Sequence, residues 1–162
     1  MRKLFLVAAS ASALFAAPAF AQDTGTLDVS AEVPESCEIT GATLDFGEVR
    51  RDEVLASGDV ALVCTSGAEF TLTADGGTNA SSGQRRLVTG SGPNATYLAY
   101  NLFTDSGRLA ELTDEDGIEG TADETTGEAT VTIYGQIPAA ADGVARVAAE
   151  DYTDSVEISV SF

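Results

Sequence analysis

The sequence contains no histidine and no tryptophan, and it has only eight basic residues, two cysteines and one methionine. Its one lysine is Lys3, so all later basic residues are arginines. Most enzymes use a positioned base, a nucleophile or a metal ion. Without histidine and later lysines, the groups left for such chemistry are mainly carboxylate pairs. We therefore expect no enzyme and no catalytic residues.

Basic charge is scarce throughout the chain. After position 21 only six arginines oppose 26 acidic residues, so 26 − 6 leaves a net charge of −20. A surface this acidic repels phosphate backbones and anionic lipid head groups. We therefore expect no nucleic-acid partner. The six arginines are Arg50, Arg51, Arg85, Arg86, Arg108 and Arg146.

The N-terminus has the three parts of a secretory signal peptide, which we assign to residues 1–21. Arg2 and Lys3 provide the positive start, residues 4–15 are apolar, and the small-x-small sequence at 19–21 is typical of a cleavage site. The apolar part is too short and too interrupted for a membrane anchor. Cleavage would leave 162 − 21 = 141 residues, enough for one domain.

The only two cysteines are Cys37 and Cys64. Past a signal peptide, an even number of cysteines indicates a disulfide and an oxidising compartment. A metal site is disfavoured, because no histidine is available to complete the ligand shell. We expect no metal and no cofactor.

Short alternating runs separated by Gly, Asn, Asp and Ser predict an all-β chain, and no stretch has a helical apolar stripe. Residues 139–150 are rich in alanine and could hold a helical turn, although a surface connection is favoured. About seven short strands with one cysteine pair predict an antiparallel β-sandwich. The expected strands are 26–33, 43–49, 58–65, 68–75, 95–104, 129–137 and 152–162.

Strict alternation of apolar and polar residues marks two runs, one near each end of the chain. The first places Leu27, Val29, Ala31 and Val33 on one face, and the second places Val156, Ile158, Val160 and Phe162 on one face. Period-two alternation is typical of a half-buried strand. Because no hairpin partner adjoins either run, we expect both to pair with another molecule.

The acidic segment 111–128 suggests a rival function. Its carboxylates could bind calcium in a self-contained extracellular module that holds Ca²⁺ or carbohydrate. The segment lacks the EF-hand pattern, since Leu112 stands where the first aspartate would be. A solvated loop or a weakly structured hairpin is the simpler expectation for this segment.

Several motifs occur in a recognisable order around the cysteine pair. Phe46-Gly47 lies between the cysteines, and three longer motifs follow: Tyr100-Asn101-Leu102-Phe103-Thr104-Asp105, Tyr134-Gly135-Gln136-Ile137-Pro138 and Tyr152-Thr153-Asp154. In this order the chain resembles the spore coat protein U-like family, the subunits of archaic (Csu-type) chaperone–usher pili. It departs from the family after Arg108, where many relatives carry a tryptophan, and at Glu150, where relatives often have glycine.

The resemblance implies an incomplete immunoglobulin-like sandwich that lacks its last strand and is completed by donor-strand exchange. Residues 22–33 would form the donor strand, with Leu27, Val29, Ala31 and Val33 as its apolar face, and residues 34–162 would form the pilin domain. Val156, Ile158, Val160 and Phe162 would border the acceptor groove. The implied partners are identical or related subunits, a periplasmic chaperone and an outer-membrane usher, and the implied destination is a fibre at the cell surface.

Overall fold

The computed structural model describes residues 22–50, 52–139 and 149–162. By its contacts the chain divides into two units, Met1–Glu32 and Val33–Phe162. The second unit, called the body below, contains every strand of the described residues. No helix in the described part is long and apolar enough to cross a membrane.

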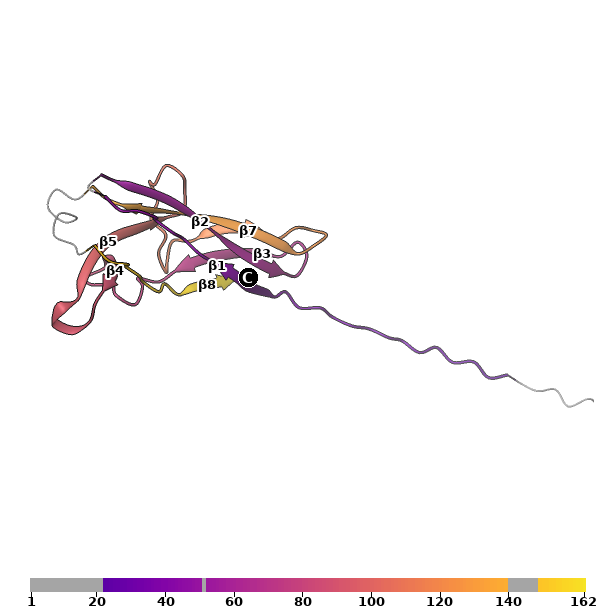
Figure 1. Ribbon diagram of the computed structural model, residues 1–162. Helices are drawn as coiled ribbons and strands as arrows, with labels where there is room; N and C mark the ends of the chain where they lie inside the picture. Colours follow the sequence, from indigo (N-terminus) through magenta and orange to yellow (C-terminus); the bar gives the residue numbers. More distant parts are fainter. Residues whose placement is uncertain (1–21, 51, 140–148) are drawn as a thin grey trace, which may run out of the picture. The chain divides into compact units, whose positions relative to one another are not determined.

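The larger sheet of the body has five antiparallel strands in the order β1-β2-β7-β5-β4 (Figure 1). Its longest ladder joins β2 to β7, from Val54 opposite Ile137 to Val63 opposite Glu128. A register shift in the β1–β2 ladder, between Ile39 and Gly41, leaves one extra residue in β1. The strands are β1 (Cys37–Ala42), β2 (Val54–Cys64), β4 (Arg85–Thr89), β5 (Thr96–Phe103) and β7 (Glu128–Ile137).

The smaller sheet has three antiparallel strands in the order β6-β3-β8. They are β6 (Ile118–Thr121), β3 (Glu69–Ala74) and β8 (Ile158–Ser161). β3 lies in the middle, so β8 is an edge strand with a partner on one side only. An edge strand leaves a row of backbone groups available for a further strand.

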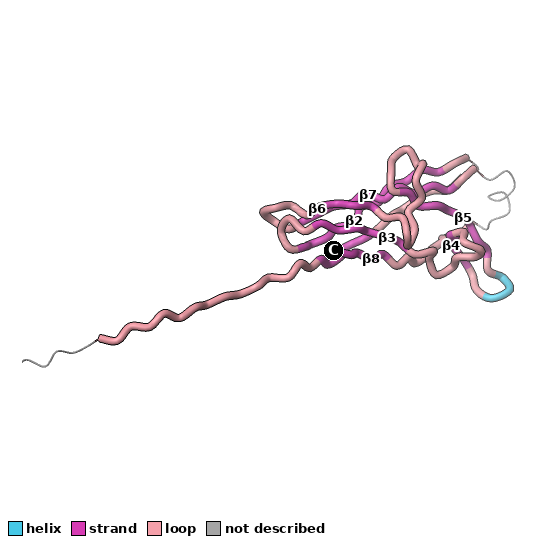
Figure 2. The backbone as a smooth tube through the Cα atoms, turned by 180° about the vertical axis from the view of Figure 1, so that it is seen from behind, coloured by secondary structure: helices cyan, strands magenta, loops and turns pink. Residues whose placement is uncertain are grey.

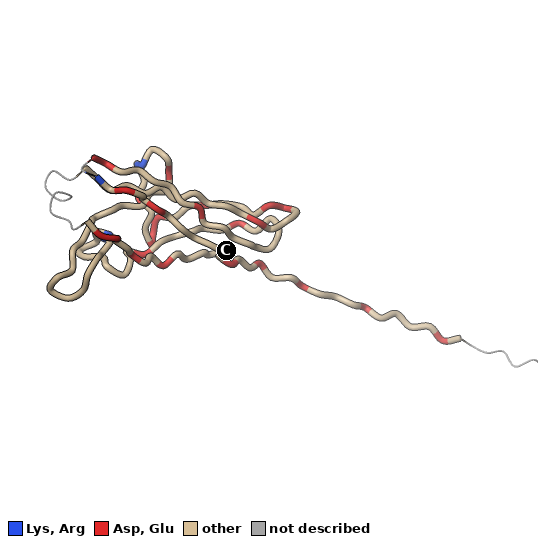
Figure 3. Tube along the Cα trace, in the orientation of Figure 1, with Lys and Arg blue, Asp and Glu red and all other residues tan. Residues whose placement is uncertain are grey.

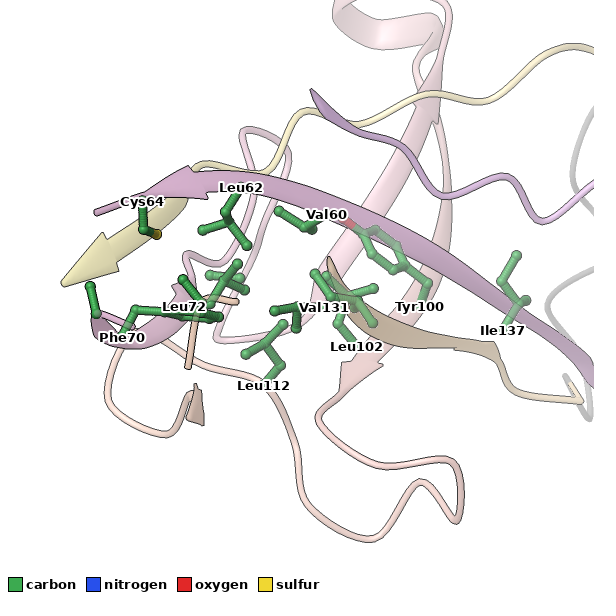
Figure 4. Close-up of a cluster of buried hydrophobic side chains, with 14 of the residues drawn as sticks. Val60, Leu62, Cys64, Phe70, Leu72, Tyr100, Leu102, Leu112, Val131 and Ile137 are labelled. Atoms are coloured by element: carbon green, nitrogen blue, oxygen red, sulfur yellow. The ribbon is translucent and has the colours of Figure 1, made fainter. Parts of the chain in front are cut away.

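The core lies between the two sheets because each strand turns every second side chain inward. Val60 and Leu62 of β2, Phe70 and Leu72 of β3, and Leu102 of β5 are among the buried side chains (Figure 4). One apolar cluster therefore receives side chains from both sheets. The prediction of an all-β antiparallel sandwich is confirmed.

Two predicted strands are wrong in whole or in part, since residues 43–49 belong to no β-ladder and within 152–162 only β8 is a strand. Residues 26–33, which we expect to pair with another molecule, form no ladder within this chain. The side chains of 44 and 46 do alternate inward, and that of 49 is partly buried, but the backbone there has no ladder partner. In residues 43–49 the alternating pattern therefore indicates which face is buried. A strand also requires a hydrogen-bonded neighbour, which these residues lack.

Three strands are missing from the prediction, namely β1, β4 and β6. β6 lies inside the acidic segment 111–128, where the ring of Phe70 occupies the space that a Cβ at Gly120 would need. The only helical element of the described residues is a 3₁₀ turn at Gly92–Asn94 (cyan in Figure 2). Most of the alanine-rich segment 139–150 lies outside the described residues.

Candidate functional site

An open groove runs between two segments of the body, residues 42–50 from the last residue of β1 onward and residues 149–158 before and into β8. It consists of two hollows of about 720 Å³ and about 280 Å³. Leu44, Phe46 and Leu87 line both hollows, which makes the groove continuous. These two segments are called the front edge (42–50) and the back edge (149–158) below.

The floor of the groove belongs to the apolar core. Val60, Leu102 and Ile133 line the smaller hollow and are each at most 5% exposed. The rings of Phe46 and Tyr100 meet edge to face with centroids 5.9 Å apart. An occupant of the groove would therefore touch core side chains directly.

Two glycines allow the front edge to lie close to the larger sheet. A Cβ at Gly58 would stand 2.1 Å from the carbonyl oxygen of Thr43, and a Cβ at Gly135 would stand 2.8 Å from the ring of Phe46. Any larger residue at either position would push the front edge away from the sheet. Gly135 of the Tyr134-Gly135 motif is thus explained by packing, because only glycine leaves room for the ring of Phe46.

The back edge is hydrogen-bonded on the side away from the groove. The N–H groups of Asp75 and Thr78 donate to the carbonyls of Glu157 and Ser155, at 2.9 and 2.8 Å. Thr153 exchanges two backbone hydrogen bonds with Val88. Residues 153, 155 and 157 thus face their backbone partners in the rest of the body.

On the groove side the backbone is open. In an extended chain successive residues direct their N–H and C=O groups to opposite sides, so those of Asp154 and Val156 point toward the groove. Neither residue makes a backbone hydrogen bond with any described residue. The same holds for Leu44 and Phe46 on the front edge. Within the described part of the chain, both edges therefore present donors and acceptors without a partner across an apolar gap.

A partly buried polar contact fastens the back edge. The Tyr100 hydroxyl donates to Oδ2 of Asp154 at 2.7 Å, and Oδ1 accepts from the backbone N–H and side-chain amide of Asn79 at 3.2 and 2.8 Å. Burial raises the pKa of Tyr100 well above its ordinary value, and the Asp154 carboxylate raises it further. The phenol consequently remains a protonated donor, and Asp154 stays fixed beside the groove.

The structure brings together some of the predicted motif residues. Phe46, Tyr100, Gly135 and Asp154 meet around the smaller hollow, while Tyr152 and Gly47 line the larger one. Two others lie elsewhere. Oδ1 of Asn101 accepts a hydrogen bond from Gln84, and Tyr134 lies beneath the guanidinium group of Arg108.

Three of the four predicted acceptor-edge residues lie at the groove or against the core, and the fourth, Phe162, lies elsewhere. Val156 and Ile158 line the smaller hollow, and Val160 packs against the core. Phe162 is 56% exposed and lines a different hollow, together with Phe70. The groove described here is therefore bordered by Val156 and Ile158, and Phe162 does not line it.

The predicted donor residues are exposed. Leu27, Val29 and Val33 are 85%, 84% and 79% exposed, and Ala31 is exposed as well. Isolated large apolar side chains are common on protein surfaces, but three at alternate positions of one segment form an apolar face. That face has no strand partner among the described residues.

The expected disulfide joins Cys37 to Cys64. The two residues are directly opposite each other in the β1–β2 ladder. Just before it, Ser36 accepts a hydrogen bond from the N–H of Thr65 and donates one to its hydroxyl. The start of the body is thus tied covalently and by hydrogen bonds to the end of β2.

Sequence reasoning did not assign Leu44, Leu87 or Asn79 to the groove. Leu44 could have been found, because it alternates with Phe46 in a short apolar pattern. Asn79 had no local signal, since its partner Asp154 is 75 residues away. Among the described residues no group of three or more Cys, Asp or Glu side chains is placed to hold a metal ion.

The chain matches the family model of the Spore Coat Protein U domain over residues 23–159, which is most of its length. It belongs to the Spore Coat Protein U domain family. No curated protein matches the chain significantly. The resemblance drawn from the motif order is therefore confirmed at the level of the family.

Among solved structures, this Spore Coat Protein U domain chain is similar to a chain in the CsuC–CsuE chaperone–tip adhesion subunit pre-assembly complex, from archaic chaperone–usher Csu pili of Acinetobacter baumannii. The identity is 18% and the TM-score 0.54, over 80% of this chain and 40% of that one. This chain thus spans less than half of that neighbour. A second similar structure is the P pilus rod subunit PapA, with 16% identity, a TM-score of 0.48, and coverage of 77% of this chain and 97% of that one.

Proposed function

We propose that this Spore Coat Protein U domain protein is a secreted structural subunit of a chaperone–usher surface pilus or coat fibre, and that it polymerises by donor-strand complementation. In this proposal a strand from another molecule enters the groove between the front and back edges. The role is structural and requires no catalysis.

The observation that carries the proposal is the open backbone on both sides of the groove. Leu44 and Phe46 on one edge, and Asp154 and Val156 on the other, have backbone groups that face an apolar gap and have no hydrogen-bond partner among the described residues. Buried backbone groups in native proteins are nearly always hydrogen-bonded. An added strand would satisfy both rows at once and would bury its alternate side chains on the core.

Residues 22–33 supply a suitable strand. Their apolar face consists of Leu27, Val29, Ala31 and Val33, and its three larger side chains are at least 79% exposed. Burial of each larger side chain would contribute about 1.5–3 kcal/mol. The segment leads into the body within a few residues of the Cys37–Cys64 disulfide, so a captured donor would be joined to a covalently fastened point of its own subunit.

Membership of the family and the signal peptide predicted for residues 1–21 support a proposed route to the fibre. We propose export through the periplasm, where a chaperone fills the groove, followed by exchange at an outer-membrane usher for the donor strand of the next subunit. The similarity in fold to a chain in a chaperone–subunit complex of archaic pili supports this assignment.

Removal of the donor tests the proposal. A mature chain that lacks residues 22–31 should accept a strand but offer none, so it should cap growing fibres and shorten them when mixed with intact subunits. The Val29→Asp variant should act in the same way, whereas Ser30→Ala, on the polar face, should polymerise normally. If the shortened and intact chains polymerise alike, the segment is not a donor.

A further inference from the structure

Among the described residues, the solvent-facing side of the groove carries mainly acidic side chains. On the front edge Asp45 stands between the inward-facing Leu44 and Phe46 and is exposed. On the back edge Glu157 is exposed between the partly buried Val156 and Ile158. The two carboxylates therefore lie on the outer face of the segments that an inserted strand would have as neighbours.

Other acidic side chains extend this charge along the groove. Glu48, Glu150 and Asp151 line the larger hollow and are exposed. Arg50 is the one described arginine that lines the groove, and it forms an ion pair with Glu48 at 2.8 Å. No other described basic residue lines the groove beside the remaining carboxylates. Along the described chain acidic residues are spread widely and basic ones are few (Figure 3).

The chain's own donor strand carries the same sign of charge. With Leu27, Val29, Ala31 and Val33 turned to the core, Asp28, Ser30 and Glu32 would face outward. Side chains on the same face of adjacent strands lie about 4.5–5.5 Å apart, where like charges oppose pairing and opposite charges favour it. The donor would set Asp28 and Glu32 beside an edge that bears Asp45 and Glu157.

We infer that the groove selects its occupant by charge, and that it prefers a strand with alternating apolar and basic side chains to the acidic donor of this chain. The inference rests on the proposed strand-acceptor function. The preferred occupant is a strand of a basic partner protein, which fills the groove first. Self-assembly then requires that this partner leave or that salt screen the repulsion.

This preference can be measured by binding labelled peptides to the full mature chain. The chain carries Val29→Asp, so that its own donor strand cannot occupy the groove. Three peptides are compared: the native 26–33 sequence, its Asp28→Asn/Glu32→Gln form and its Asp28→Lys/Glu32→Lys form. Fluorescence anisotropy in about 20 mM salt should give the tightest binding for the lysine form and the weakest for the native one. The extremes should differ by about tenfold or more, and the gap should close near 0.5 M salt, where charges are screened within about 4 Å.

Two controls separate selection at the groove from general attraction to an acidic protein. A lysine peptide that also carries Val29→Asp should not bind, because its charge would enter an apolar hollow. The chain variant Asp45→Asn/Glu157→Gln should reduce the discrimination between peptides, whereas Asp114→Asn/Glu115→Gln, outside the groove, should leave it unchanged. Binding of the Val29→Asp lysine peptide as tightly as its parent would overturn the inference.

The remaining outcomes distinguish the inference from the function on which it rests. Equal affinities for all three peptides in low salt would overturn charge selection and leave the strand-acceptor function standing. If no peptide binds at either salt concentration, the groove does not accept strands, and both proposals are wrong.

Discussion

Residues 27–33 and 154–160 have nearly the same alternating pattern but different structures. In the second segment Val156, Ile158 and Val160 pack against the core, and its outer hydrogen bonds reach β3, β4 and the segment between them. In the first segment Leu27 and Val29 are more than 80% exposed, and there is no ladder. An alternating apolar and polar pattern thus indicates a segment suited to pairing as a strand. It does not indicate whether the neighbouring strand belongs to the same molecule.

The largest expected effect is on the paired segment. Ile158→Asp places a carboxylate on the core side of β8, where burial of a charge without a partner is strongly unfavourable. We expect it to lower the free energy of unfolding by about 4 kcal/mol or more, measured by urea denaturation. Ser159→Asp, on the exposed face of the same strand, is the matched control and should change it little. Similar stabilities for the two variants would contradict the core-facing position of Ile158.

The next effect concerns the covalent link at the start of the body. Cys37→Ser or Cys64→Ser opens a loop of sequence separation 27, which should cost about 3–4 kcal/mol through the entropy of the unfolded chain. Each variant should show one free thiol and lower yield in the periplasm. Reduction of the native protein should reproduce the loss of stability. Unchanged yield and protease resistance in both variants would mean that the disulfide does not stabilise this fold.

A smaller effect is expected where the back edge is fastened. Tyr100→Phe removes the hydroxyl that donates to Asp154 and should lower the free energy of unfolding by about 1–3 kcal/mol. Leu102→Met, a volume-conserving change at a neighbouring buried position, tests whether packing alone explains the loss and should cost less. Equal stability of Tyr100→Phe and Leu102→Met would mean that the hydrogen bond to Asp154 contributes nothing beyond packing.

Because the pKa of Tyr100 is raised, we expect the free energy of unfolding to depend on pH. The pKa of Tyr100 is raised in the folded protein, so the unfolded chain releases this proton first, near pH 10. Its contribution to stability is therefore complete below about pH 10 and is lost as the pH rises above that value. Denaturation curves between pH 8 and 11 should show a weaker decline for Tyr100→Phe. An identical decline in both proteins would contradict this assignment.

The smallest effect on folding is expected in the unpaired segment. Val29→Asp changes a side chain that is 84% exposed, and so it should alter the free energy of unfolding of the isolated subunit by less than about 0.5 kcal/mol. The same change should abolish polymerisation, as judged by light scattering. A large loss of stability in the monomer would show that residue 29 packs against its own subunit.

Local patterns predicted much of the fold, because alternating side chains and turn residues are local properties. They gave β3, β5 and β7 to within one residue at each end. They failed where long-range pairing decides: Leu44 and Phe46 have the pattern of a strand without a ladder, and β6 has a ladder despite its acidic surroundings. The order of the motifs pointed to Phe46, Tyr100 and Asp154. It could not predict that they line one hollow, because they are far apart in the sequence.

The most direct test of the missing-strand account is to let the chain fill its own groove. A flexible linker and a second copy of residues 26–33 are added after Phe162, where the tethered strand has an effective concentration in the millimolar range. The natural chain, this fused chain and the fused chain with Val29→Asp in the added copy are compared by melting temperature and oligomeric state. The account predicts a monomeric fused chain that melts about 10 °C or more above the natural one, with the gain lost in the charged copy. A fused chain that melts no higher than the natural one, or a charged copy that works equally well, would contradict it.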